Sequence, residues 1–135
     1  MIATIVVTHH TLAESLIATA EFIVGPNPNL VGVGISQNED VEAIRKRLLE
    51  MIKKFHKEGR NVLILTDMFG GTPSNIGFAL YEPGKVEIVS GVNLPILLKL
   101  AGGCRESDKG LKEIAAEITE YGRKNIFTAA EFLDL

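Results

Sequence analysis

Two residues that can carry out acid–base or nucleophilic chemistry each follow an apolar run of strand length. His9 ends the run that begins at Ile2, and Asp67 comes just after Val62–Leu65. A carboxylate can accept the hydrogen of one imidazole nitrogen and leave the other nitrogen free as a base or nucleophile. The two residues therefore predict a reactive histidine if the fold brings both strand ends together. The alternative is that His9 merely ends its strand.

The residues after Asp67 have the composition of an anion-binding turn. Gly70 and Gly71 permit backbone conformations that a side chain would forbid, and they let a ligand approach their amides closely. Thr72 could cap a helix whose first position is Pro73, a residue without an amide hydrogen to leave unpaired. Unpaired amides at a helix start attract anions, phosphate above all. We therefore expect Gly70, Gly71 and Thr72 to bind a phosphoryl-like group.

Three neighbouring residues are accessory candidates. His10 follows His9 directly, so on an extended backbone its side chain points to the other side. A two-histidine metal site is therefore not expected, and no third ligand has the spacing of a metal site. His10 could assist the reaction of His9, compete with His9 or simply be solvated. Met68 and Phe69 either pack into the core or form an apolar docking surface for a protein partner.

Hydrolase and nucleotide-binding chemistry fit the sequence less well. Ser90 ends a strand pattern, but a nucleophile elbow needs a serine between two glycines, and Ser90 lacks the preceding one. Asn93 is more consistent with capping the next helix at the rim of the same crevice. No Gly-x-Gly-x-x-Gly motif follows the first strand and no Walker lysine is present, which argues against a nucleotide site.

The composition excludes several further classes. The chain has 135 residues, 46% of them hydrophobic, and a net charge of −3, so we expect one globular domain over residues 1–135. The basic runs are short, Arg45–Arg47 and Lys53–Lys54, so nucleic-acid binding is not expected. A single cysteine excludes an internal disulfide. The apolar stretches are short and no charged leader is present, which favours a cytoplasmic protein. No cofactor or metal is expected.

The order of the apolar patterns predicts an α/β fold. Right-handed crossovers would place helices on both faces of a doubly wound, mostly parallel sheet with strand order 2-1-3-4. The first and third strands would then be neighbours, so His9 and Asp67 would meet at the crevice where the chain direction reverses. The expected strands are 2–7, 30–35, 62–65, 86–89 and a short last one at 125–128. The expected helices are 12–24, 41–55, 72–80, 94–101 and one that begins at Ser107 or Asp108 and closes at Gly122.

Four segments in a fixed order carry a resemblance to a known family. They are Ile5–His9, Thr19–Gly25, Thr66–Asn75 and Gly91–Pro95. Together they resemble the mannose-type enzyme IIA domain of the bacterial phosphoenolpyruvate-dependent sugar phosphotransferase system. The resemblance covers nearly the whole chain.

The resemblance implies a phosphotransferase component with a phosphohistidine intermediate. By this resemblance His9 accepts a phosphoryl group from the carrier protein HPr and passes it to a IIB component. Asp67 would orient the imidazole ring, and the Thr72 hydroxyl would help to hold the phosphoryl group. Sugar uptake would involve the membrane only indirectly, through IIC and IID components that also select the sugar.

The resemblance also implies a homodimer, in which the last strand is antiparallel and exchanged between subunits. Such an exchange would account for the apolar tail after Gly122. One position departs from the family, which usually has Thr-His-Gly where this chain has Thr8-His9-His10. Alignment through Thr19–Gly25 places His9 on the phosphorylated position.

Two functional classes stay open. The first is a phosphoryl carrier in sugar uptake of the mannose, fructose or sorbose type, or close to it the subunit that feeds dihydroxyacetone kinase. The second is a regulatory phosphoprotein of the same family, whose phosphorylation state signals to partners without a dedicated transporter.

Overall fold

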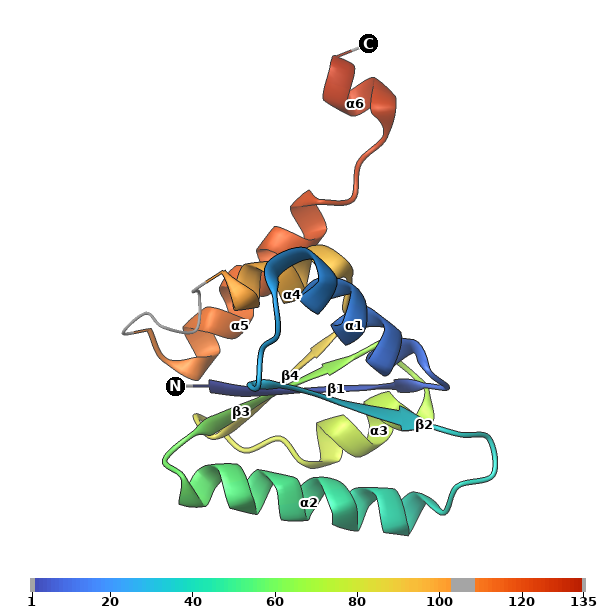
Figure 1. The fold of residues 1–135 in the computed structure, drawn as a ribbon, viewed down its shortest axis with the longest axis vertical. Coiled ribbons are helices and arrows are strands. Elements are labelled where there is room, and N and C mark those ends of the chain that lie inside the picture. Colours follow the sequence, from blue (N-terminus) through green and yellow to red (C-terminus); the bar gives the residue numbers. More distant parts are fainter. Residues whose placement is uncertain (1, 103–108, 135) are drawn as a thin grey trace.

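A four-stranded parallel sheet forms the centre of the molecule (Figure 1). The computed structural model describes residues 2–102 and 109–134. The strands are β1 (Ile2–His9), β2 (Leu30–Ile35), β3 (Asn61–Thr66) and β4 (Val86–Ser90), in the order β2-β1-β3-β4. Both the parallel sheet and the 2-1-3-4 order predicted from the sequence are confirmed.

Helices cover both faces of this sheet, as predicted. In Figure 1, α1, α4 and α5 lie on one side of the sheet and α2 and α3 on the other, and the two buried apolar clusters divide in the same way. The helices are α1 (Leu12–Val24), α2 (Val41–Lys57), α3 (Thr72–Ala79), α4 (Leu94–Ala101), α5 (Leu111–Lys124) and α6 (Ala129–Leu133).

The two central strands are apolar without alternation because both of their faces are covered. Alternate residues of β1 divide between the clusters: Ile5 packs with α2 and α3, whereas Val6 packs with α1, α4 and α5. The β1–β3 register pairs Val7 with Thr66. This pairing brings the carboxyl ends of the two strands, and therefore His9 and Asp67, to one edge of the sheet.

Helix α5 differs at its end from the sequence prediction. It continues to Lys124, past Gly122, which was expected to close it. A Cβ at position 122 would lie 2.6 Å from the Cδ1 atom of the buried Ile96. The glycine thus allows close packing of α5 against α4, where the prediction gave it the role of a helix end. The predicted start of this helix, at Ser107 or Asp108, lies outside the described residues.

The C-terminal segment also differs from the prediction. In this single chain, residues 126–128 pair with no strand, and α6 follows where an apolar tail was expected. The Thr128 hydroxyl caps α6 by accepting a hydrogen bond from the N–H of Glu131, at 3.0 Å. Figure 1 shows α6 standing away from the sheet and its helices. The predicted strand 125–128 is therefore absent from the chain by itself, because no edge strand lies beside this segment.

Over the described ranges 2–102 and 109–134, none of the helices is both long enough and apolar enough to cross a membrane.

Candidate active site

The site lies at the edge of the sheet where β1 and β3 end. The helix that follows β1 packs on one face of the sheet, and the helix that follows β3 packs on the other. The chain therefore diverges between these two neighbouring strands, which is where open α/β sheets bind their ligands.

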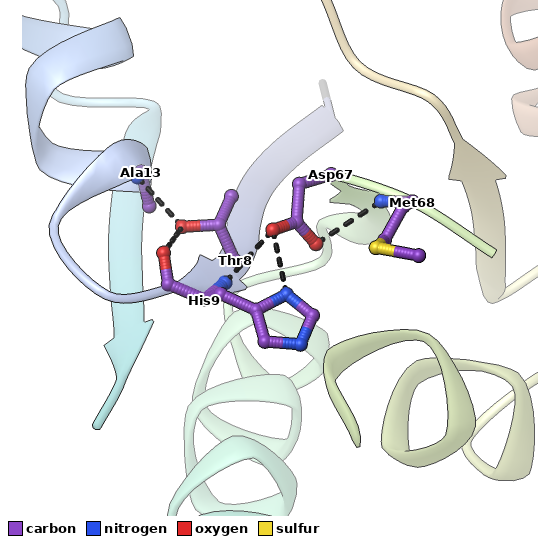
Figure 2. A network of polar contacts seen from close by, with 5 residues as sticks. All are labelled: Thr8, His9, Ala13, Asp67 and Met68. Carbon is purple, nitrogen blue, oxygen red and sulfur yellow. Dashed lines mark hydrogen bonds and ion pairs between the residues drawn. The ribbon is translucent and has the colours of Figure 1, made fainter. Parts of the chain in front are cut away.

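His9 and Asp67 are in direct contact at this point (Figure 2). One carboxylate oxygen, Oδ2 of Asp67, accepts the backbone N–H of His9 at 2.9 Å and lies 2.8 Å from Nδ1 of its imidazole. The other oxygen, Oδ1, accepts the N–H of Met68 at 3.0 Å. The predicted meeting of the two strand ends is confirmed. Because Nδ1 faces the carboxylate, the free nitrogen of the ring is Nε2.

Burial and hydrogen bonding have opposite effects on the pKa of Asp67. Its side chain is only 11% exposed, whereas that of His9 is 48% exposed. Burial alone would raise the pKa of the Asp67 carboxyl. The two hydrogen bonds from His9 and the attraction of a protonated imidazole outweigh it and hold the pKa of Asp67 below its ordinary value of 3.8. Asp67 is therefore a carboxylate at neutral pH and acts as an acceptor.

Thr8 fixes the backbone on which His9 stands, a role that the sequence analysis did not assign. Its side chain is fully buried; its hydroxyl accepts the N–H of Ala13 at 2.7 Å and donates to the carbonyl oxygen of His9 at 3.1 Å (Figure 2). Thr11, at the start of α1, makes no capping bond with its side chain. Thr8 thus takes over the cap from within β1. The sequence feature that could have indicated this role is a hydroxyl residue at the end of an apolar run.

Gly71 stands against the imidazole ring of His9. A Cβ at this position would lie 2.6 Å from Cε1 and 2.9 Å from Nε2 of His9, so a side chain would displace the ring. Gly70 has a φ of 96°, in the region that favours glycine. Gly70 thus has the predicted special backbone conformation, whereas Gly71 makes room for the His9 ring. The predicted approach of a ligand to their amides stays a prediction.

The start of α3 is displaced by one residue from the prediction. Gly71 is the N-cap, Thr72 is the first residue of the helix, and Pro73 is the second. The interpretation of Thr72 as the cap is therefore wrong, because the position beside the His9 ring, which only a glycine fits, precedes it. Thr72 borders the cavity beside His9. The unpaired amides of the first turn begin at the same place.

His10 lies in a turn, which changes its expected direction. Its φ is 53°, so the backbone is left-handed and not extended. His9 and His10 border the same cavity of about 590 Å³, together with Ile35, Ser36, Gln37 and Thr72. The expectation that the two side chains face opposite sides was made for an extended backbone, so it does not apply to this turn.

Met68 and Phe69 lie on the surface beside the site. Their exposed fractions are 54% and 74%, so the interpretation as core residues is wrong. The ring of Phe69 packs edge-to-face on that of Phe78, with 5.6 Å between centroids. Phe78 and Tyr81 are also more than 40% exposed. Met68, Phe69 and Phe78 are thus exposed apolar side chains, which we call the apolar rim. A docking surface for a protein partner stays a prediction for Met68 and Phe69.

Asn93 joins two helices at the end of β4. Its side-chain oxygen accepts the N–H of Ile96 at 3.1 Å and so caps α4, as predicted. Its side-chain nitrogen donates to the carbonyl oxygen of Gly122 in α5, also at 3.1 Å. Both polar atoms of Asn93 are thus used in holding α4 and α5 together, and its accessory role in the site stays a prediction.

Comparison with known proteins identifies the family to which this chain belongs. The sequence profile described as EIIA-man, PTS system fructose IIA component, matches residues 3–119. This chain belongs to that family. The resemblance inferred from the four segments is thereby confirmed, and the chain is a mannose-type EIIA domain of the sugar phosphotransferase system (PTS), a phosphotransferase component.

Individual relatives agree with this assignment. The fructose-specific EIIA component of Bacillus subtilis (strain 168) is 28% identical over 135 residues, covering 99% of this chain and 90% of that protein. The mannose-specific EIIAB component of Escherichia coli (strain K12) is 29% identical over 93% of this chain, and the match spans only 38% of that longer protein. The crystal structure of phosphotransferase system component EIIA from Streptococcus agalactiae superposes with a TM-score of 0.86 at 25% identity, covering 97% of this chain and 99% of that one.

The contact between Gly71 and the His9 ring leads to a first prediction. Gly71→Ala places a methyl group where the ring now lies, so His9 should turn away and lose its hydrogen bond to Asp67. Because the ring is half exposed, the free energy of unfolding should change by about 1 kcal/mol or less. Long-range ¹H–¹⁵N NMR of the imidazole reports the ring contact, and Asn75→Ala on the exposed face of α3 is the control. Unchanged His9 ring signals in Gly71→Ala would contradict the geometry.

The lowered pKa of Asp67 leads to a second prediction, on acid stability. The unfolded chain binds the Asp67 proton at higher pH than the folded chain does, so the stabilisation is complete above about pH 4 and is lost as the pH falls through the folded pKa. The difference in unfolding free energy between the wild type and Asp67→Asn should therefore be largest at neutral pH and shrink below about pH 4. Urea titrations between pH 7 and pH 2.5 measure it, with Glu14→Gln on the exposed face of α1 as the control. A difference that stays constant with pH would contradict the assignment.

Proposed function

We propose that this chain is a phosphoryl carrier of the phosphotransferase system. It accepts a phosphoryl group from HPr on Nε2 of His9 and passes it to a IIB component. The observation that supports this most strongly is the Asp67 carboxylate on Nδ1, 2.8 Å away, which leaves Nε2 beside the start of α3. The relatives named as fructose-specific EIIA and mannose-specific EIIAB components support the same general role.

The transfer requires little chemistry from the protein beyond positioning and charge stabilisation. The lone pair of Nε2 attacks phosphorus, the bond between phosphorus and the donor atom breaks, and the electron pair leaves with the donor. The proton on Nδ1 stays in the hydrogen bond to Asp67, whose negative charge stabilises the positive charge that develops on the ring. Transfer to the acceptor reverses these steps. The amides of Gly71 and of the first turn of α3, with the Thr72 hydroxyl, offer donors to the phosphoryl oxygens.

The apolar rim supports the involvement of protein partners. Met68 and Phe69 follow Asp67, the hydrogen-bond partner of His9, directly in the chain, and a donor and an acceptor must each dock at His9 in turn. Exposed apolar side chains next to a reactive group are typical of such docking surfaces. We propose that HPr and IIB both use the rim, which consists of Met68, Phe69 and Phe78.

Substitution of the site residues tests the carrier function. We expect incubation with phosphoenolpyruvate, enzyme I and HPr at mildly alkaline pH to add one acid-labile phosphoryl group, which intact-mass spectrometry detects. His9→Ala should abolish the adduct because it removes the nucleophile, and His10→Ala should keep most of it. Asp67→Asn should slow labelling about 10²-fold or more, since an amide holds neither the ring nor its charge as well.

Each variant also has an outcome that contradicts the proposal. Labelling that survives in His9→Ala, or that is lost in His10→Ala alone, would show that the phosphorylated residue is misassigned. If the wild type forms no adduct while the donors are active on another protein, the proposed carrier function itself is contradicted.

We also propose a homodimer in which the segment after α5 pairs with the partner's sheet. β4 is an edge strand, and a groove of about 480 Å³ runs between it and α5, bordered by Glu87, Val89, Lys112 and Thr119. Ile126 and Phe132 are each 74% exposed, and Phe127 stacks on Phe132 at 5.6 Å between centroids. A second copy would bury these side chains and satisfy the unpaired edge.

A charge in this segment tests the dimer. Ile126→Asp should convert a dimer to a monomer in light scattering coupled to size-exclusion chromatography, because the carboxylate cannot be buried in an apolar interface. Phe22→Asp is the matched control, since Phe22 is 90% exposed but lies on α1. A wild type that elutes as a monomer, or a dimer that only Phe22→Asp disrupts, would contradict this arrangement.

A further inference from the structure

The backbone at His10 is held in an unfavourable conformation by its neighbours. His10 is one of two described non-glycine residues with positive φ, at 53°. Its N–H donates to the carbonyl oxygen of Ile35 at 2.8 Å. Its own carbonyl oxygen packs against Gly34, where a Cβ would approach it to 2.1 Å. β2 thus fixes residue 10 in a region that costs a side-chain-bearing residue free energy.

This turn places His10 at the cavity beside His9. His9 and His10 both border the cavity, and Thr72, from the start of α3, borders it too. The His10 side chain is exposed, and within residues 2–102 and 109–134 it makes no hydrogen bond or ion pair. An unfavourable backbone conformation that places an uncommitted imidazole in a reactive site suggests a function for that side chain.

The nearby acidic groups are committed to other partners. Glu39, from the turn after β2, accepts the N–H and the hydroxyl of Ser36 at 2.9 and 2.8 Å. Asp67, from the end of β3, is occupied by His9 and by the N–H of Met68. The ring N–H of His10 is therefore available to a ligand in the cavity.

We propose that His10 binds the phosphoryl group carried on His9. This inference rests on the proposed carrier function and adds a second donor to it. A phosphoryl group on Nε2 of His9 has oxygens facing the cavity, and the His10 ring N–H donates a hydrogen bond to one of them. The start of α3 supplies the other donors. His10 thus stabilises the phosphorylated form without forming a bond to phosphorus.

The phosphoryl equilibrium with HPr tests this role, in the wild type, His10→Gly and His10→Asn. Glycine removes the donor and relieves the backbone, whereas asparagine keeps a donor and tolerates the left-handed region. We expect His10→Gly to be at least as stable to urea as the wild type, yet to shift the equilibrium about tenfold toward phospho-HPr, the loss of one hydrogen bond to a charged group. His10→Asn should recover much of that shift. In the wild type, phosphorylation should also move the His10 ring signals in long-range ¹H–¹⁵N NMR.

The outcomes separate this inference from the proposed function. A wild type that takes no phosphoryl group from active phospho-HPr overturns both. A wild type that is phosphorylated, with the same equilibrium in His10→Gly, overturns the role of His10 alone. A His10→Gly protein that loses stability in step with phosphoryl affinity also overturns it, because residue 10 would then act only through the fold.

Discussion

The contact between Asp67 and His9 is the interaction on which the rest of the site depends. One carboxylate oxygen accepts the backbone N–H of His9 and lies within hydrogen-bond distance of Nδ1 of its ring, so a single group fixes the end of β1 and the direction of the imidazole. This is possible because β1 and β3 are neighbours in parallel register, and because both strands are buried on both faces. The sheet is thus the rigid support that keeps a half-exposed histidine in one orientation.

The residues around this contact also help to hold the His9 ring in its orientation. Thr8 closes the turn behind His9 from inside the core, and Gly71 leaves room for the ring in front. The start of α3 then lies beside Nε2, the atom that we propose to carry the phosphoryl group. A cavity already opens beside both histidines. Phosphoryl transfer depends mainly on such preorganised positioning by the protein.

The sequence predicts those features that depend on burial and chain order. Continuous apolar runs identify the central strands, and the alternation of strands and helices yields the 2-1-3-4 order, which brings His9 to Asp67. Close approach between distant residues leaves no such local signal. Gly71 and Gly122 were assigned to a turn and a helix end, whereas the first faces the His9 ring and the second faces Ile96. The left-handed turn at His10 is missed for the same reason, because β2 imposes it from 25 residues away, through Gly34 and Ile35.

The most direct test of the account is to determine which imidazole nitrogen of His9 carries phosphorus. Asp67 occupies Nδ1, so the phosphoryl group should be attached to Nε2. Long-range ¹H–¹⁵N and ³¹P NMR of the phosphorylated protein, labelled with ¹⁵N in its histidines, distinguishes the two isomers. A phosphoryl group on Nε2, with the Nδ1–H still hydrogen-bonded, is the predicted result. Attachment to Nδ1 would mean that the hydrogen bond to Asp67 breaks before transfer, and would contradict the central role given to that contact.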